Sequence, residues 1–277
     1  MMKLNYLLCV IILAGAVHRI QGQSVTRATA ASLLTVGAFN VQNFSPKKIE
    51  NEKVLALIID ILNRYDIVLV QELVDRKSKI VNFILESLNR AHGKEVFGVV
   101  ASPRVGRSSQ KEQYGYFYRK NKVKVLNSYL YDDQDDHYER EPFVVTFQSK
   151  RAKGLNNFTM VGIHVKPDAA VAELQTLHNV IESVAKRDSK DVILLGDLNA
   201  DCSYVAKKYW PTIPLWTNDK YLWLIPHDAD TTATPSNCAY DRVILRGDKI
   251  KSSVVLSSVQ IFQFEKEYNL PNELVII

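Results

Sequence analysis

The sequence predicts one layered α/β domain, with two packed sheets flanked by helices, and three observations support this class. Apolar runs rich in β-branched and aromatic residues outnumber helical patterns along the chain. An early strand–helix–strand succession is typical of a βαβ unit with parallel pairing. No linker, internal repeat or low-complexity tract divides the chain. Periodicity alone does not separate two packed sheets from one doubly wound sheet.

The predicted elements follow from the spacing of apolar residues. Apolar runs at 33–39 and 66–70 predict the first two strands, and residues 54–65, with apolar side chains three and four apart, predict the helix between them. Further helices are predicted at 80–88 and 170–186 by the same spacing. The remaining predicted strands are 96–101, 114–118, 123–129, 143–147, 158–165, 192–195, 242–245 and 253–256.

Composition narrows the class of protein. The 277 residues are 47% hydrophobic and include only 11 Gly and 9 Pro, which excludes disordered and collagen-like chains. Three cysteines are too few for a small scaffold that disulfides hold together in place of a core.

The N-terminus has the pattern of a secretory signal peptide. Lys3 precedes a charge-free apolar run at 4–17, which is too short for a comfortable membrane span, and small residues follow it. We expect cleavage after Gly22 or in the Ala14-Gly15-Ala16 neighbourhood. Cleavage after Gly22 divides the chain into a signal peptide at 1–22 and one secreted domain at 23–277. The alternatives are a buried N-terminal helix or an uncleaved anchor.

Cleavage at this point changes the charge and the cysteine count. It removes Lys3 and Arg19, which lowers the formal charge from +5 to +3. It also removes Cys9 and leaves Cys202 and Cys238, an even pair that in a secreted chain indicates one disulfide. Two glycosylation triplets begin at Asn43 and Asn157 and fit the same secretory route.

Polar side chains follow four of the predicted strands. Asn40, Glu72 and His164 each stand at the end of an apolar run, and Asp197 and Asn199 follow a fourth run. Carboxylate and amide oxygens at strand ends suit Mg²⁺ or Ca²⁺ better than zinc. A histidine beside such a cation is typical of phosphate-ester hydrolysis. Taken singly, an aspartate after a strand is more often a helix cap or a turn residue, and a lone histidine at a strand end is more often structural.

Seven segments in order give a more specific indication. They are FNVQNF, DIVLVQE, GRSSQKEQY, REPFVV, GIHVKP, LLGDLNADCSYV and DTTATPSNCAYDRVIL. Together they resemble the deoxyribonuclease I family over residues 35–275, and YDDQDD before REPFVV most resembles its deoxyribonuclease gamma branch. The resemblance implies the endonuclease/exonuclease/phosphatase fold, a four-layer α/β sandwich of two packed mixed sheets flanked by helices.

The resemblance also implies roles for individual positions. His164 with Glu112 matches the pair that protonates the leaving O3′, and Asp241 matches the residue that orients a second histidine. The matching metal positions are Asn40, Glu72, Asp197 and Asn199. The positions matching contacts to the DNA backbone are Arg107, Lys111, Arg140 and Tyr240. Asp230, Thr232 and Thr234 match a structural calcium site, and Cys202–Cys238 matches the family's disulfide.

Simpler explanations exist for two of these sets. Arg107, Lys111 and Arg140 also fit an ordinary solvated basic face. The segment from Asp230 to Thr234 also fits a polar turn. Val74, Gln110 and Gln42 stand where relatives carry groove-contacting residues, which weakens any prediction of sequence preference.

The last residues depart from the family pattern. Family members close with a Ser-Asp-His segment and a final strand, whereas this sequence ends with Leu-Val-Ile-Ile. We therefore expect Asp241 to lack its histidine and the last strand to be missing. Three explanations stay open, namely a truncated gene model or alternative transcript of an active nuclease, a secreted binding protein with little activity, or a substitute base elsewhere in the chain.

These observations predict a secreted endodeoxyribonuclease. We expect it to depend on Mg²⁺ and Ca²⁺ and to leave 5′-phosphorylated ends with little sequence specificity. DNA is the expected partner, bound mainly through phosphates, and we expect a monomer without stable membrane association. The sequence carries no signal for or against actin binding. The alternatives are a catalytically impaired DNA- or partner-binding paralogue, or a phosphodiesterase of the same fold acting on another substrate.

Overall fold

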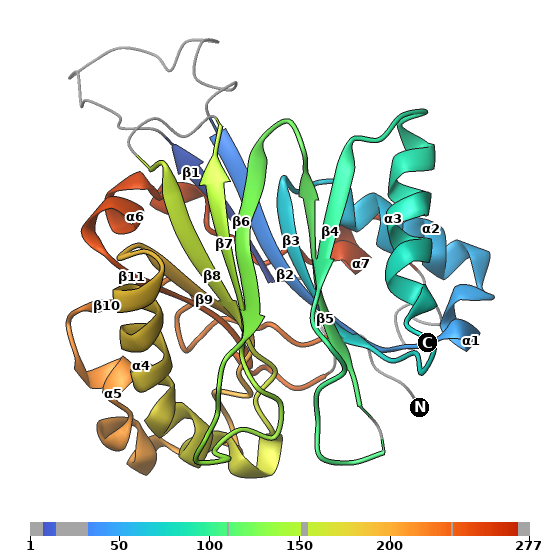
Figure 1. Cartoon of the computed structure of the whole chain (residues 1–277). Coiled ribbons are helices and arrows are strands. Elements are labelled where there is room, and N and C mark those ends of the chain that lie inside the picture. The colour runs from blue at the N-terminus through green and yellow to red at the C-terminus, as the bar shows by residue number, and fades with distance from the viewer. Residues whose placement is uncertain (1–7, 15–32, 110, 151–154, 234, 271–277) are drawn as a thin grey trace.

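The computed structural model describes residues 8–14, 33–109, 111–150, 155–233 and 235–270, and its centre is two packed sheets (Figure 1). The first sheet has the order β1-β2-β3-β5-β4, and the second has the order β10-β11-β9-β8-β7-β6. The strands of the first sheet are β1 (Leu8–Ala14), β2 (Leu33–Phe44), β3 (Ile67–Leu73), β4 (Phe97–Ala101) and β5 (Gln113–Arg119). Those of the second are β6 (Val123–Leu130), β7 (Phe143–Ser149), β8 (Asn157–Gly162), β9 (Val192–Asp197), β10 (Tyr221–Trp223) and β11 (Asp241–Arg246).

Helices cover the outer face of each sheet (Figure 1). The α-helices are α1 (Pro46–Ile49), α2 (Glu52–Leu62), α3 (Lys79–Ala91), α4 (Ala170–Arg187), α5 (Pro214–Thr217), α6 (Asp248–Ser253) and α7 (Phe264–Glu267). The short 3₁₀ helices are η2 (Pro167–Ala169), η3 (Lys207–Thr212) and η4 (Leu256–Ser258). None of the helices in the described ranges has both the length and the apolarity needed to cross a membrane.

Three apolar clusters separate the four layers. Side chains such as Leu69, Tyr116 and Phe147 fill the space between the sheets. The apolar faces of α2 and α3 pack on the first sheet, and those of α4 and α5 pack on the second. The four-layer sandwich predicted from the sequence is therefore confirmed.

The early βαβ unit is also confirmed. Strands β2 and β3 pair in parallel, with Phe39 opposite Val70, and α2 connects them. Asn51 begins α2 by accepting a hydrogen bond on its side chain from the Val54 amide. Parallel pairing brings the carboxyl ends of β2 and β3 to one edge, where Asn40 and Glu72 stand.

Strand β1 corrects one alternative for the N-terminus. It pairs antiparallel with β2, so that Leu13 lies opposite Leu34 and Ile11 opposite Val36. Leu8–Ala14 is thus a strand, not the buried helix of that alternative. An apolar run of this length is compatible with a strand, a helix or a signal sequence, because periodicity does not distinguish them. Cleavage after Gly22 falls outside the described residues and stays a prediction.

Two other expectations about elements were wrong. Residues 253–256 were expected as a strand, but Ser253 ends α6 and Leu256 begins η4. Strand β8 ends at Gly162, so His164 lies in the loop that follows it and not within the strand. That loop leads into η2 and α4, and its exit from the sheet leaves the histidine free to face the neighbouring strands.

Candidate active site

One buried glutamine joins the two sheets beneath the candidate site. Gln71 on β3 donates from Nε2 to the Ile163 carbonyl at 2.8 Å and accepts on Oε1 from the Asp197 amide at 2.9 Å. Gly196 leaves room for it, since a Cβ there would lie 2.4 Å from the Ile163 oxygen and its φ is +133°. The strand ends that carry the predicted residues are therefore fixed relative to one another.

His164 and Glu112 form a buried pair, as the sequence predicts. The imidazole Nδ1 lies 3.0 Å and 3.1 Å from the two Glu112 oxygens, and its Nε2 lies 3.9 Å from Asp197 Oδ2. The Tyr114 hydroxyl accepts the His164 amide at 3.0 Å. A carboxylate on Nδ1 fixes the tautomer and directs Nε2 toward the open side of the site.

The carboxylate of Glu112 and the imidazolium of His164 each stabilise the charged form of the other. Burial disfavours the charged imidazolium, but the Glu112 carboxylate outweighs it and raises the pKa of His164 to about 9. Burial also opposes ionisation of Glu112, yet His164 and Arg140 hold its pKa below the ordinary value. At neutral pH the site therefore contains a protonated histidine, as a general acid requires.

Arg140 belongs to this centre, although the sequence placed it among DNA-backbone contacts. Its Nε lies 3.0 Å from Glu112 Oε2, and its NH1 donates to the His164 carbonyl at 3.2 Å. Its side chain is only 18% exposed. Arg140 can therefore hold the Glu112–His164 pair and still offer a positive charge to a bound phosphate.

The predicted metal positions converge beside His164. Asn40 Nδ2 donates to Glu72 Oε1 at 2.8 Å and to Asp197 Oδ2 at 3.0 Å. The Asn199 amide donates to Asp197 Oδ1 at 3.0 Å. Glu72 and Asn199 both have positive φ values, 59° and 46°, which non-glycine residues rarely adopt. Backbone strain of this kind clusters at functional sites.

The donor set fits a hard divalent cation, with one qualification about Asn40. One carboxylate oxygen of Glu72 and one of Asp197 accept hydrogen bonds from the side-chain amide of Asn40, which carries a partial positive charge. The same two oxygens would be able to hold a cation. In this arrangement Asn40 orients the carboxylates and does not present its own oxygen. Across the described part of the chain, no three His, Cys, Asp or Glu side chains form a ready metal centre.

Asp241 lies at the same edge with an unsatisfied carboxylate. It is buried opposite Asp197 on the neighbouring strand, and neither carboxylate oxygen accepts a hydrogen bond from a described residue. The nearby Thr231 hydroxyl donates instead to the Cys238 carbonyl and accepts the Asp241 amide. Burial and the Asp197 charge raise the pKa of Asp241 well above its usual range. A buried carboxylate without a donor is uncommon and requires a reason beyond packing.

The other histidines in the described ranges have partners elsewhere. His92 meets the side chain of Asn63, His137 lies 3.7 Å from the Asp135 carboxylate, His178 meets the Gln175 carbonyl, and His227 meets the buried Arg242. None of these bonds reaches Asp241.

The remaining predicted DNA contacts flank this centre. Arg107 is half exposed and pairs with Asp136 at 2.8 Å, while its backbone amide donates to Glu139 at 3.0 Å. Lys111 is exposed, and Tyr240 packs on Tyr204 with ring centroids 5.3 Å apart. Gln110, a predicted departure from the family, lies outside the described residues.

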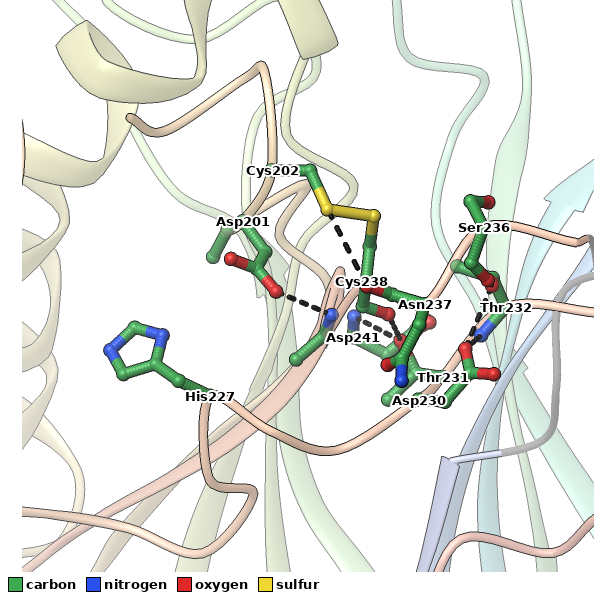
Figure 2. Close-up of a disulfide and its surroundings, with 12 residues drawn as sticks. Asp201, Cys202, His227, Asp230, Thr231, Thr232, Ser236, Asn237, Cys238 and Asp241 are labelled. Carbon is green, nitrogen blue, oxygen red and sulfur yellow. Dashed lines mark hydrogen bonds between the residues drawn. A yellow bond between two sulfur atoms is a disulfide. The ribbon is translucent and has the colours of Figure 1, made fainter. Parts of the chain in front are cut away.

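The predicted calcium segment forms a tight turn beside a disulfide (Figure 2). Asp230 Oδ1 accepts the Thr232 amide at 2.9 Å and the Thr232 hydroxyl at 2.8 Å. Thr234 lies outside the described residues. The turn therefore brings two of the three predicted ligands together, and it is equally complete as a polar turn without an ion.

The predicted disulfide is confirmed. Cys202 and Cys238 are bonded across 36 residues of sequence, which ties the loop after β9 to the loop before β11 (Figure 2). Asp201, next to Cys202, accepts the Ala239 amide at 2.8 Å. These links hold Asp197 and Asp241 on adjacent strands with their connecting loops fixed.

Replacing both Cys202 and Cys238 by serine is expected to lower the free energy of unfolding by about 3–4 kcal/mol, because the bond closes a loop of this length in the unfolded chain. Urea unfolding under oxidising conditions measures the loss. Reduction of the wild-type chain is the control and should give the same midpoint. An unchanged midpoint in the double variant would contradict a stabilising role.

Several residues that shape the site were not predicted. Gln71, Tyr114, Lys48 and Arg242 each make buried hydrogen bonds that fix a loop of the site. Lys48, for example, donates to the Val41 and Gln42 carbonyls. No local pattern marks these residues, because their partners are distant in sequence or are backbone carbonyls.

Comparisons with known proteins agree with the fold and identify the family. The model of the endonuclease/exonuclease/phosphatase family matches residues 37–260. The chain is 42% identical to deoxyribonuclease-1 of Bos taurus over 249 residues, which cover 88% of each protein. It is 39% identical to human deoxyribonuclease gamma over 251 residues, covering 88% of this chain and 82% of that protein.

A solved structure supports the architecture alone. A humanized D. rerio TDP2 superposes with a TM-score of 0.54 at 16% identity, covering 78% of this chain and 84% of that chain. The similar identities to deoxyribonuclease-1 and deoxyribonuclease gamma do not separate the branches, so the gamma-like assignment stays a prediction. The chain belongs to the endonuclease/exonuclease/phosphatase family and, within it, to the deoxyribonuclease I family.

Proposed function

We propose that the chain is a divalent-metal-dependent endonuclease that hydrolyses phosphodiester bonds of DNA. The observation that carries this proposal is the buried His164–Glu112 pair, whose free Nε2 faces Asp197 beside Asn40 and Glu72. A general acid next to oxygen ligands for a divalent cation is an arrangement typical of enzymes that hydrolyse phosphate esters. The relatives named deoxyribonuclease-1 and deoxyribonuclease gamma support DNA as the substrate.

The residues divide the reaction between them. Glu112 holds the Nδ1 proton, so that the second proton of the imidazolium resides on Nε2. A water oxygen bonds to phosphorus as the bond from phosphorus to O3′ breaks, the Nε2 proton passes to O3′, and the water releases its proton to solvent. Arg140 holds Glu112 in place and binds a phosphate oxygen. Glu72 and Asp197 would hold Mg²⁺, with Asn40 orienting both and Asn199 fixing Asp197. When bound, the cation supplies neutralisation of the charge that develops on the phosphate.

The finer parts of the proposal concern substrate contacts, calcium and location. Arg107, Lys111 and Tyr240 flank the centre and can contact the DNA backbone, which favours little sequence specificity. Asp230 and Thr232 would hold a structural Ca²⁺ with Thr234. Secretion through a leader at 1–22 is supported by the apolar run and by the single disulfide.

Nicking of a supercoiled plasmid tests the function. The purified chain is expected to relax and then linearise the plasmid with Mg²⁺ and Ca²⁺ present, to leave 5′-phosphates, and to stop when EDTA is added. Cleavage that is unaffected by EDTA would contradict metal dependence. The absence of any nicking by a folded chain would contradict the proposed activity.

One observation favours a second candidate, a secreted protein that binds DNA without cutting it. None of the hydrogen bonds or ion pairs of the other described histidines reaches Asp241, so the described residues place no histidine beside it to activate the attacking water. A folded chain that binds plasmid in a shift assay but never nicks it would support this candidate.

A further inference from the structure

We propose that Glu173 is a positioning residue for DNA cleavage, because its buried carboxylate joins the two backbone segments that carry His164 and Arg140. This inference rests on the proposed function. Glu173 lies in the first turn of α4, a helix whose other buried residues are all apolar, and it is only 1% exposed. A charged side chain in such a place requires a reason beyond packing.

A single oxygen of Glu173 joins the two segments. Its Oε1 accepts the backbone amide of Glu139 at 3.2 Å and that of Lys166 at 3.4 Å. Glu139 immediately precedes Arg140, and Lys166 follows His164 by two residues. The carboxylate therefore fixes the backbone on both sides of the Arg140–His164 contact, where NH1 meets the His164 carbonyl at 3.2 Å.

The connection extends to the predicted DNA contact at Arg107. The side chain of Glu139 accepts the Arg107 amide at 3.0 Å and meets Lys166 Nζ at 3.2 Å. A displacement of the Glu139 backbone would therefore move Arg107 and Arg140 together. Glu173 is the buried end of this chain of contacts, and Arg107 is its exposed end.

The carboxylate is costly for the fold. Its Oε2 is buried and accepts no hydrogen bond from a described residue. The titratable and charged groups that face it are Glu139, Arg140 and Tyr138 before β7, His164 and Lys166 after β8, and Tyr114 on β5. Burial raises the pKa of Glu173 to about 7, although the two backbone amides, Arg140 and His164 act in the opposite direction.

The free-energy cost of burying the Glu173 carboxylate allows a functional role to be distinguished from a structural one by measuring stability and cleavage separately. Because the folded pKa lies above the value of an exposed glutamate, the burial of Glu173 disfavours the folded state increasingly as the pH rises through about 7. Glu173→Gln keeps an acceptor oxygen of the same reach and removes the charge. The variant is therefore expected to melt at a higher temperature than the wild type at pH 8.5, with a smaller difference at pH 5.

Cleavage is expected to change in the opposite direction. A neutral amide accepts the two backbone hydrogen bonds more weakly and no longer attracts Arg140 and His164, so both segments drift. Misplacement of a catalytic group by a fraction of an ångström lowers kcat steeply. We expect kcat to fall about tenfold in Glu173→Gln and about a hundredfold in Glu173→Ala, and KM to rise less than kcat falls, since Arg107 and Arg140 move with the Glu139 backbone.

The experiment compares three variants in plasmid cleavage, melting at pH 5 and 8.5, and amide hydrogen exchange. Glu182→Gln is the matched control, since Glu182 lies on the same helix and bonds Arg246 and Tyr221 away from the site. The control should keep wild-type kcat. In Glu173→Gln, exchange at the Glu139 and Lys166 amides should speed up while exchange elsewhere on α4 is unchanged.

Two results would overturn the inference. One is wild-type kcat in a folded Glu173→Gln, and the other is unchanged exchange at the two amides. If Glu173→Ala does not fold, Glu173→Gln alone decides. If the wild type does not cut DNA, the proposed function fails, and the exchange measurement still decides whether Glu173 fixes the two segments.

Discussion

Replacement of His164 by alanine is expected to lower the rate of plasmid nicking by about 10²–10⁴-fold, the usual contribution of a general acid. No other described histidine is placed to take over, since His164 alone bonds Glu112 and faces Asp197. DNA binding should persist, because Arg107, Lys111 and Arg140 are retained. Initial rates at saturating plasmid, together with a shift assay, separate the two effects.

The control for this variant is His178→Ala, which removes a half-buried histidine on α4 whose Nδ1 contacts only the Gln175 carbonyl. It should nick like the wild type. Cleavage by His164→Ala at the wild-type rate would show that the proton for O3′ comes from another group.

The pH profile gives a second test of the same pair. The active form carries a proton on His164, so the wild-type rate should fall as the pH rises through about 9. Glu112→Gln removes the main charge that raises the pKa of His164, so burial and Arg140, which lower this pKa, are opposed only by Asp197. The alkaline limb should therefore move to lower pH in Glu112→Gln. An unmoved limb would contradict the assignment.

The sequence predicted the parts of the site that follow strands. Asn40, Glu72 and Asp197 come directly after, or at the end of, apolar runs, and the parallel pairing of β2 and β3 brings the first two together. The pairing of His164 with Glu112 came from the resemblance, because 52 residues separate them and no spacing rule joins them.

The parts that could not be predicted depend on contacts across the fold. Glu173 sits within an ordinary amphipathic helix, and only the folded chain shows that its carboxylate meets two loops. The residues next to Arg140 in the sequence do not indicate whether its side chain faces solvent or Glu112. In the sequence Gln71 is one more polar residue at the end of an apolar run. Only the folded chain shows its hydrogen bonds to Ile163 and Asp197.

Local apolar patterns also have limits for element boundaries. Residues 253–256 have the composition of a strand, but they end α6 and begin η4 because the tertiary contacts around β11 and α6 determine the conformation. Leu8–Ala14 shows the opposite ambiguity, since the same residues have the pattern of a signal sequence and pair with β2 as a strand. In both segments the conformation of the backbone depends on the elements that lie beside it.

Replacement of Asp197 by asparagine is expected to lower nicking at a fixed Mg²⁺ concentration by about 10²-fold or more, because several kcal/mol of charge stabilisation depend on the cation it would hold. Asparagine keeps the size of the side chain and one acceptor oxygen, so it can retain one of the two hydrogen bonds that Asn40 and Asn199 donate to different Asp197 oxygens. The Mg²⁺ concentration for half-maximal activity should rise. Activity measured over a Mg²⁺ titration tests both effects.

Stability should change in the opposite direction in the same variant. Asp197 and Asp241 are buried on paired strands, and the charge of Asp197 raises the pKa of Asp241. Removal of one charge relieves this repulsion, so Asp197→Asn should melt at a higher temperature than the wild type in EDTA.

Divalent metal should then raise the melting temperature of the wild type more than that of the variant. Asp191→Asn is the matched control, since Asp191 is also buried but accepts the Ile250 amide at the opposite end of β9. If metal raised the melting temperature of Asp197→Asn as much as that of the wild type, Asp197 would not be a metal ligand. The close placement of the Asp197 and Asp241 carboxylates would then need an explanation other than cation binding.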